Sequence, residues 1–268
     1  MSVLEKIVRS KRIEIEATRK NTPVALLEKS KYFQRETLSL ERSLLDKGKH
    51  GIIAEFKRKS PSRGVINSSV KPENVCPRYL NSGASAVSVL TNGEFFGGSN
   101  EDLAKARKLC DGPILRKEFI IDEYQVVESK SIGADAILLI ADILSAFQMK
   151  RLSELAKSLK MEVLYEIHDK SGIEKLPPGS RLTGINSRNL GNFSIDMNIL
   201  RRTIGMLPPG SLKIAESGIH SAEAVSDLKN MGFTGFLIGE LFMKEKDPGE
   251  ACSKFINNLK NLDSLQKE

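Results

Sequence analysis

An acidic and a basic residue stand two positions apart at the end of a short apolar segment. Glu55 and Lys57 follow the apolar run 52–54, and Pro61 interrupts regular structure soon afterwards. Apolar runs of this length, bounded by such residues, are typical of buried strands. Residues two apart in a strand point to the same face, and burying charges there is costly. The pattern therefore predicts an acid–base pair that is kept for chemistry.

Polar side chains also end several later apolar segments. In a parallel barrel, all these ends lie on the face where active sites form. Exposed strand ends would explain one or two polar residues, but they explain less well two lysines and two carboxylates with apolar neighbours just upstream. The polar ends are Arg116 to Glu118, Tyr165 and Glu166, Asn186 to Arg188, Glu216 to Gly218, and Gly239 with Glu240.

The elements that must position these residues form a regular series after residue 50. Short apolar or β-branched runs alternate with helical patterns, which indicates parallel strands joined by crossover helices. The runs lack period-two alternation, as expected for strands buried on both faces. Spacing favours a closed barrel but leaves an open, doubly wound sheet as the alternative. The eight expected strands are 52–57, 86–91, 113–118, 136–141, 163–167, 182–186, 212–216 and 235–239.

Helix ends between these runs can be read from the sequence. The segments 145–148 and 122–125 begin with Ser and Asp and end with Gln, a pattern typical of capped helix starts. Gly83, Gly133 and Gly232 each follow a helical pattern and precede a strand, as glycines that end helices do. These signals support a repeated strand–loop–helix unit.

Residues 1–50 differ from the repeat. Their apolar residues lie among many charges and predict two or three amphipathic helices before the first strand. A length of 268 residues suits one large α/β barrel. We therefore expect an α/β fold in a single domain, 1–268, made of an N-terminal helical extension (1–50) and a (β/α)8 TIM barrel (51–268). We expect the first helices to lie across one end of the barrel and to help cover the site.

Composition narrows the function classes. The net charge is +7, but the basic residues are spread along the chain and aromatic residues make up only 6%. This favours an anionic small-molecule substrate over nucleic acid. No apolar run approaches the roughly 20 residues of a membrane span, and the N-terminus lacks a signal-peptide core, so we expect a cytoplasmic protein. The three cysteines have no metal-ligand spacing, and no metal site is expected.

Two glycine turns follow the seventh and eighth expected strands. Ser217-Gly218 and Gly239-Glu240 each open toward a helical pattern. Backbone N–H groups at such turns attract anions, and barrels commonly hold phosphate in the loops after strands seven and eight. The two turns together predict a phosphate-binding site.

These residues resemble those of the indole-3-glycerol-phosphate synthase family, the barrel enzymes of tryptophan biosynthesis, over essentially the whole chain. The segment 53–62, IAEFKRKSPS, is the most specific match. The supporting matches are SVLT at 88–91 with FFGGS at 95–99, ILRKEF at 114–119, LYEI at 164–167, GINSRNL at 184–190 and AESGI at 215–219.

The resemblance implies a carboxy-lyase that closes the ring of 1-(2-carboxyphenylamino)-1-deoxy-D-ribulose 5-phosphate without a cofactor. It implies Lys117 as general acid, Glu166 as general base, and Glu55 with Lys57 as a further catalytic pair. The implied substrate contacts are Ser60, Phe96, Phe119, Asn186, Arg188 and Ser217, with Gly218, Gly239 and Glu240 at the phosphate turns.

One position departs from the family in a way that bears on the site. Glu240 stands where some members have serine, and a carboxylate would repel phosphate. We expect backbone N–H groups to bind there while the side chain turns away. The alternatives are another phosphate-binding barrel such as a phosphoribosyl isomerase, a non-catalytic phosphate-binding barrel, and a basic RNA-binding protein. We expect a monomer, with a weak homodimer as the alternative.

Overall fold

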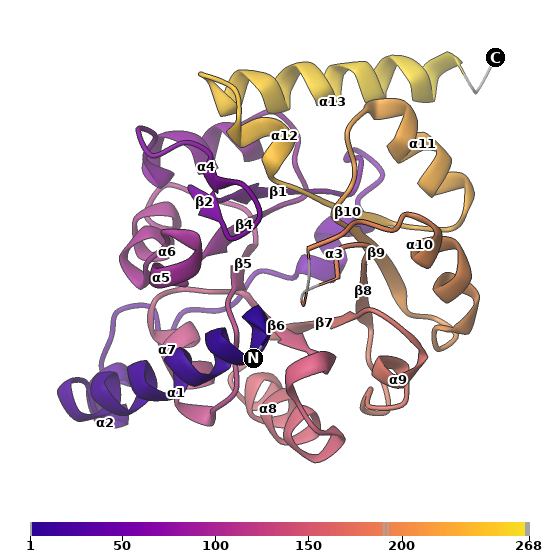
Figure 1. The fold of residues 1–268 in the computed structure, drawn as a ribbon. Helices are drawn as coiled ribbons and strands as arrows, with labels where there is room; N and C mark the ends of the chain where they lie inside the picture. The colour runs from indigo at the N-terminus through magenta and orange to yellow at the C-terminus, as the bar shows by residue number, and fades with distance from the viewer. Residues whose placement is uncertain (1, 190, 192, 266–268) are drawn as a thin grey trace.

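Eight parallel strands close into a barrel in the computed structural model of the chain, which describes residues 2–189, 191 and 193–265 (Figure 1). This confirms the closed barrel and excludes the open sheet. Every expected strand agrees with the structure to within one residue at either end. In barrel order the strands are β1 (Ile52–Phe56), β10 (Gly235–Ile238), β9 (Leu212–Glu216), β8 (Leu182–Asn186), β7 (Glu162–Ile167), β6 (Ala136–Ile140), β5 (Ile114–Lys117) and β4 (Ala86–Leu90).

Helices surround the barrel on its outer side (Figure 1). None of the helices in the described part of the chain is long and apolar enough to cross a membrane. After β1 a small antiparallel hairpin, β2 (Lys59–Ser60) with β3 (Gly64–Val65), rises over the barrel mouth. The helices that follow are α4 (Pro72–Asn81), α5 (Gly93–Phe96), α6 (Asn100–Arg107), α7 (Glu123–Ser131), η1 (Ala141–Ile143), α8 (Ala146–Ser158), α9 (Lys170–Ile173), α10 (Asn198–Thr203), η2 (Ile204–Met206), α11 (Ala222–Asn230), α12 (Glu240–Met243) and α13 (Pro248–Leu265).

The predicted helix ends are confirmed. Ser145 and Asp122 cap α8 and α7, and in each case the Gln three residues later completes a capping box. Gly83, Gly133 and Gly232 have φ of 102°, 95° and 97°, values that side chains disfavour. Local chemistry thus sets where these helices begin and stop.

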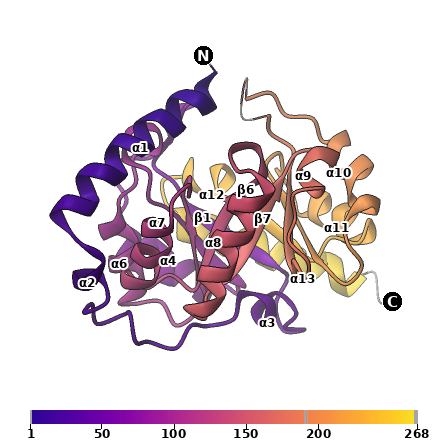
Figure 2. The ribbon, with the colours of Figure 1, turned by 90° about the horizontal axis from the view of Figure 1, so that it is seen from below.

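The N-terminal extension forms α1 (Val3–Asn21), α2 (Val24–Leu27) and α3 (Leu40–Leu44). Helix α3 closes the end of the barrel where the strands begin, opposite the active-site face (Figure 2). Its buried Leu40 and Leu44 pack against the barrel interior. The backbone N–H of Glu41 donates to the Glu162 carboxylate at the start of β7, over 2.8 Å.

Helix α1 lies at the other end, beside the strand termini where polar residues gather (Figure 2). Its buried Ile7 joins the same interior cluster as Phe119, and Nζ of Lys11 lies 3.2 Å from Oε1 of Glu118. Of the first helices, α1 therefore lies beside residues at the polar ends of the strands, and its covering of the site stays a prediction. The apolar pattern predicted burial, but only contacts with distant residues decide which end of the barrel each helix closes.

Candidate active site

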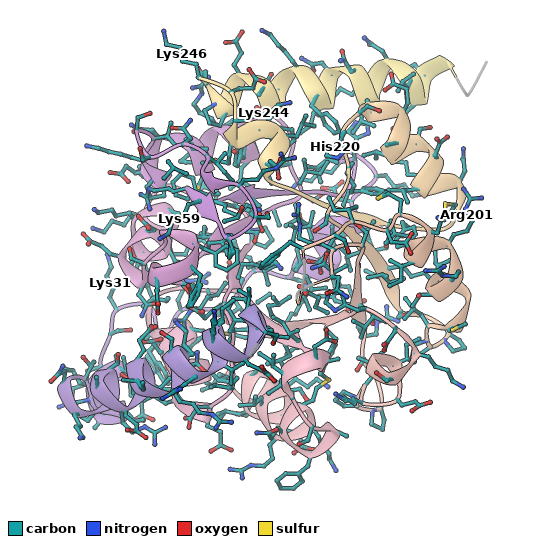
Figure 3. The ribbon with its side chains drawn as sticks, in the orientation of Figure 1. Lys31, Lys59, Arg201, His220, Lys244 and Lys246 are labelled. Carbon is teal, nitrogen blue, oxygen red and sulfur yellow. The ribbon has the colours of Figure 1, made fainter. Side chains whose placement is uncertain are left out.

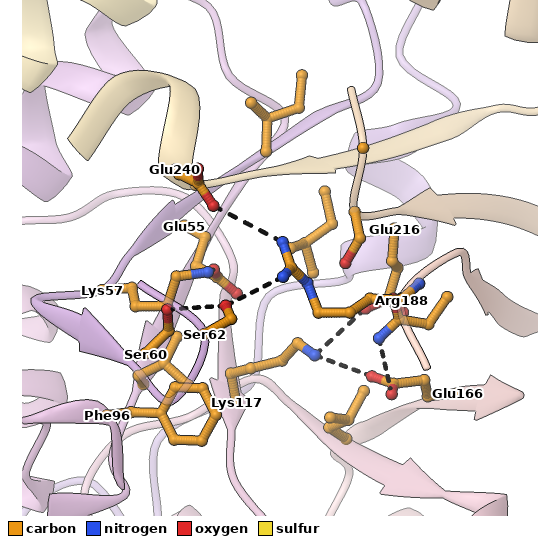
Figure 4. A pocket seen from close by; sticks show the side chains of 18 of the residues that line it. Glu55, Lys57, Ser60, Ser62, Phe96, Lys117, Glu166, Arg188, Glu216 and Glu240 are labelled. Carbon is orange, nitrogen blue, oxygen red and sulfur yellow. Dashed lines mark hydrogen bonds and ion pairs between the residues drawn. The ribbon is translucent and has the colours of Figure 1, made fainter. Parts of the chain in front are cut away.

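One cavity lies at the C-terminal ends of the barrel strands, and every residue predicted to act in catalysis or substrate binding lines it (Figure 4). The strands bring together residues that are more than 180 positions apart in the chain. Their individual roles remain predictions. The residues are Glu55, Lys57, Ser60, Phe96, Lys117, Phe119, Glu166, Asn186, Arg188, Ser217, Gly218, Gly239 and Glu240.

Lys117, at the end of β5, occupies the centre of the cavity. Its Nζ lies 2.9 Å from Oε2 of Glu166 and 3.2 Å from Oε2 of Glu216 (Figure 4). Burial by itself lowers the pKa of Lys117, but Glu166, Glu216 and Glu55 outweigh it and raise the pKa above the ordinary value. The free site therefore holds Lys117 as an ammonium ion that can donate a proton.

The two carboxylates beside Lys117 are in different states. Burial favours the neutral form of Glu166, but the positive charges of Lys117 and His168 outweigh it and lower its pKa. Asn186 also donates a 3.0 Å hydrogen bond to Glu166. Burial raises the pKa of Glu216, and the neighbouring Glu166 adds to the rise. One carboxylate is thus held ionised while the other favours its protonated form, a division suited to acid–base work.

Glu216 also lacks hydrogen-bond donors among the described residues. Neither of its oxygens accepts a well-formed hydrogen bond from the described residues, since Nζ of Lys117 is near but not aligned. A side chain at Gly184 would place its Cβ 2.1 Å from Oε1 of Glu216. The glycine in β8 therefore makes the space that the carboxyl group occupies. A buried carboxyl group without donors is available to a ligand.

Glu55 and Lys57 form the ion pair expected from their spacing. Nζ of Lys57 donates to Oε1 of Glu55 over 2.5 Å, and both side chains face the cavity (Figure 4). A Cβ at Gly239 would lie 2.6 Å from Oε1 of Glu55. Gly239, predicted only as part of a phosphate turn, is therefore also required for the acid of β1 to fit.

Arginines and hydroxyls line the mouth. Nη1 of Arg188 donates to Oγ of Ser62 over 3.0 Å, and Oγ of Ser60 lies 3.3 Å from that hydroxyl. The carboxylate of Glu240 lies 2.9 Å from Nε of Arg63 and 3.6 Å from Nη2 of Arg188. Glu240 is thus engaged with arginines of the mouth, and phosphate binding by its backbone stays a prediction.

Part of the cavity wall, from residues on and just after β4, β5 and β6, is apolar. The rings of Phe96 and Phe119 lie 5.9 Å apart at an interplanar angle of 37°. Leu90, Leu138 and Ile140 continue this wall. Such a surface suits a flat aromatic ring.

The turn after β9 has an unusual backbone. Ser217 has φ of +66° and Gly218 has φ of +71°. A positive φ at a non-glycine residue costs about 1–2 kcal/mol, and such strain clusters at functional sites. A Cβ at Gly218 would approach Sδ of Met197 to 2.4 Å, and this crowding together with the positive φ favours glycine here. Leu190, which ends the matched segment 184–190, lies outside the described residues.

Sequence reasoning gave no role to three residues that matter here. It marked Glu216 only as a polar strand end, although Glu216 carries the same signal as Glu166, an acid at the end of an apolar strand. Ser62 contacts Arg188 but stands in a loop whose path the sequence does not show. His168 lies behind Glu166, and no pattern in the sequence marks it.

Comparisons with known proteins show the family of this chain. The family model for indole-3-glycerol phosphate synthase matches residues 4–255. The synthase of Bacteroides thetaiotaomicron is 43% identical over 254 residues, which cover 95% of this chain and 97% of that protein. The synthase of Campylobacter fetus is 41% identical over 91% of this chain and 95% of its own length.

Solved structures agree in fold. A mutant tryptophan synthase alpha-subunit from Pyrococcus furiosus superposes with a TM-score of 0.59 at 13% identity, covering 80% of this chain and 99% of its own. The 3-hexulose-6-phosphate synthase of Salmonella typhimurium also has a TM-score of 0.59, at 11% identity over 79% of this chain and 99% of that one. At these identities the likeness concerns the barrel alone. The family match and the close relatives establish that this chain belongs to the indole-3-glycerol phosphate synthase family.

Proposed function

We propose that this protein converts 1-(2-carboxyphenylamino)-1-deoxy-D-ribulose 5-phosphate to indole-3-glycerol phosphate, with release of carbon dioxide and water. One observation carries the proposal beyond family membership. A buried ammonium lies between an ionised and a protonatable carboxyl group, beside an aromatic wall and opposite two glycine turns. This arrangement supplies a proton donor, a proton acceptor, a surface for the aryl ring and a place for phosphate.

Lys117 acts at the first step. The ring carbon that bears the carboxylate attacks the ketone carbon, and Nζ of Lys117 donates a proton to the ketone oxygen as it becomes a hydroxyl. Carbon dioxide then leaves, and the electron pair of the broken bond restores the benzene ring. Lys57, paired with Glu55 in the free site, orients the substrate carboxylate for this loss.

Two carboxyl groups divide the dehydration. Glu216, whose raised pKa favours the protonated form, donates a proton to the departing hydroxyl. Glu166, held ionised by Lys117 and His168, takes the proton whose loss completes the aromatic five-membered ring. The protein gives two protons to the water, one from Lys117 and one from Glu216, and Glu166 takes one back. The one proton taken up overall from solvent balances the negative charge that is lost when the substrate carboxylate leaves as carbon dioxide.

The remaining residues hold the substrate. Phe96 and Phe119 pack on the anthranilate ring, and Arg188 with Asn186 contacts its polar groups. The backbone at Gly218 and Gly239 receives the phosphate, and the hydroxyls of Ser60 and Ser217 add contacts.

The test is turnover of the substrate followed by indole fluorescence, because the chain has no tryptophan of its own. Lys117→Ala is expected to reduce kcat by at least about 100-fold, the usual worth of a general acid. Lys105→Ala, an exposed lysine paired with Glu101, is the matched control and should keep wild-type turnover. Near-native kcat in Lys117→Ala would refute the acid role, and no fluorescence with the wild-type protein would refute the activity.

We also propose a cytoplasmic monomer that binds no nucleic acid. The spread of its basic side chains supports the last point, since Lys31, Lys59, Arg201 and Lys246, labelled in Figure 3, stand on separate segments of the chain. Light scattering across protein concentrations should give one chain mass of 29.6 kDa. A mass that rises with concentration would favour the weak homodimer, and a salt-sensitive RNA complex would contradict the last point.

A further inference from the structure

His168 connects three loops behind the active site. It follows β7 and is 8% exposed. Its Nε2 lies 2.9 Å from the backbone oxygen of Arg188, in the loop after β8. Its Nδ1 lies 3.1 Å from Oδ2 of Asp142, in η1 after β6. Oε1 of Glu166 is 3.9 Å from Nε2. In the proposed reaction this side chain neither gives nor takes a proton.

The partners of the ring define its charge. A backbone carbonyl can only accept a hydrogen bond, so Nε2 must carry a proton. The carboxylate beside Nδ1 favours a proton there as well, although its alignment is that of an ion pair rather than a hydrogen bond. With an acceptor at each nitrogen, the imidazolium form fits this position better than either neutral tautomer.

The surrounding charges agree with this form. Burial lowers the pKa of His168, but Asp142 and Glu166 outweigh it and raise the pKa to about 9. Asp169, on the next position, adds a third nearby carboxylate. The cations in this region are directed elsewhere: Lys117 contacts the far oxygen of Glu166, and Lys175 donates to the carbonyl of Ala141 over 2.7 Å.

The same ring also controls the segment that carries Arg188. The N–H of Arg188 donates to Oδ1 of Asn186 over 3.0 Å, while its carbonyl accepts from His168. Asn186 in turn donates to Glu166. Both backbone groups of Arg188 are therefore fixed by side chains that also contact the carboxylate of Glu166, and its guanidinium is aimed at the mouth of the site.

We propose that His168 is a positioning residue, held as an imidazolium ion by Asp142, which fixes the backbone of Arg188 and helps keep Glu166 ionised. The kinetic part of this inference rests on the proposed function. The charge state of the ring does not, and it can be measured in the free protein.

Nuclear magnetic resonance of the full chain tests the charge directly. The chain has three histidines, so ¹⁵N-labelled imidazoles can be assigned by single substitutions. At pH 7.5 both nitrogens of His168 should be protonated, and the ring should titrate at about 9. Asp142→Asn should shift this titration to lower pH. A neutral ring at pH 7.5, or a titration that Asp142→Asn leaves in place, would overturn the proposal.

Kinetics of two substitutions test the positioning role. His168→Leu removes both the charge and the donor to Arg188, and kcat/KM should fall roughly 10- to 100-fold, as expected for loss of a charged hydrogen bond. His168→Gln retains an N–H that can reach the carbonyl, so it should recover most of the KM effect but not the kcat effect that comes from Glu166. His50→Gln, which alters the 2.7 Å pair with Asp263 beside the start of β1, is the matched control.

The outcomes separate the two proposals. An inactive wild-type protein would contradict the proposed function and leave the resonance test to decide on His168. An active wild type with unchanged kinetics in a folded His168→Leu variant would contradict the positioning role alone. If His168→Leu does not fold, the split between KM and kcat in His168→Gln decides, and equal effects on both would count against the proposal.

The pH dependence of the free energy of unfolding tests the charge of His168 independently. The pKa of a histidine in the unfolded chain is about 6.5, and folding raises that of His168 to about 9. A raised pKa contributes stability that is complete below the unfolded value and is lost as the pH rises to the folded one. Urea unfolding between pH 6 and 10 should therefore show a decline in wild type that is shallower in His168→Gln. Parallel pH profiles would refute the charged state.

Discussion

Asp135 and Glu216 are carboxyl groups buried at opposite ends of the same barrel. Asp135 precedes β6, and each of its oxygens accepts two hydrogen bonds. Arg35 and the N–H of Leu38 donate to Oδ1, while Arg107 and the N–H of Ile114 donate to Oδ2. Glu216 ends β9 and accepts no well-formed hydrogen bond from the described residues.

The difference in hydrogen bonding distinguishes a structural carboxylate, Asp135, from a carboxyl group that is suited to catalysis, Glu216. A buried charge whose lone pairs are all satisfied is fixed in one ionisation state and one geometry. A buried carboxyl group without donors has a raised pKa and can exchange a proton with a ligand. The end of the barrel where strands begin is therefore built from completed ion pairs, while the end that binds substrate keeps an incomplete one.

The largest expected effect is at the completed cluster. Asp135→Asn places an amide among donors that require a carboxylate, and leaves Arg107 and Arg35 short of a counter-charge. The free energy of unfolding should fall by about 3–5 kcal/mol, measured by urea denaturation. The fraction that remains folded should turn over substrate at the wild-type kcat. A lowered kcat in that fraction would show that the two ends are not independent.

Glu216→Gln should have the opposite profile. The amide cannot donate a carboxylic proton to the leaving hydroxyl, so kcat should fall by about 100-fold, or about 2.7 kcal/mol. Stability at neutral pH should be retained, because the neutral amide replaces a buried group that favours its neutral form. A wild-type kcat together with reduced stability would show that Glu216 has a structural role like that of Asp135.

A smaller effect of Glu216 is expected on the way the free energy of unfolding changes with pH. The pKa of Glu216 is raised on folding, so the folded state binds its proton more tightly than the unfolded state does. Stability gained from this proton is present below the unfolded pKa and is lost as the pH rises through the raised value. Unfolding titrations should show a steeper decline in wild type than in Glu216→Gln, which keeps only the part of the decline that comes from His168. Identical profiles would contradict the raised pKa.

The smallest effect is expected from an exposed ion pair at the same end as Asp135. Arg181 lies 2.5 Å from Glu41 of α3, but its side chain is 53% exposed. Exposed pairs contribute about 0–1 kcal/mol, so Arg181→Ala should lower the free energy of unfolding by less than 1 kcal/mol and leave kcat unchanged. A loss as large as that of Asp135→Asn would mean that burial is not what separates the two pairs.

Local patterns in the sequence were sufficient for the strands, the helix caps and the gathering of Glu55, Lys117 and Glu166 at one face, because each depends on residues close along the chain and on the geometry of a barrel. They were not sufficient for the partners of Glu216 or His168, which come from other strands and loops. Nor did they reveal that Gly239 makes room for Glu55. The closeness of Gly239 to Glu55 depends on the register between β1 and β10, which pairs Ala54 with Ile238.

The anchoring of α3 has a consequence for how the chain is made. The bond from Glu41 to Glu162 spans 121 residues, so α3 leaves the ribosome long before its partner exists. At about 5–20 residues per second, the wait is roughly 6–24 s. During that time Leu40 and Leu44 have no barrel to enter. Helix α3 is therefore among the first elements to be synthesised, but it can dock only after β7 has been made. During this interval in a living cell, the nascent chain exposes its apolar N-terminal segment.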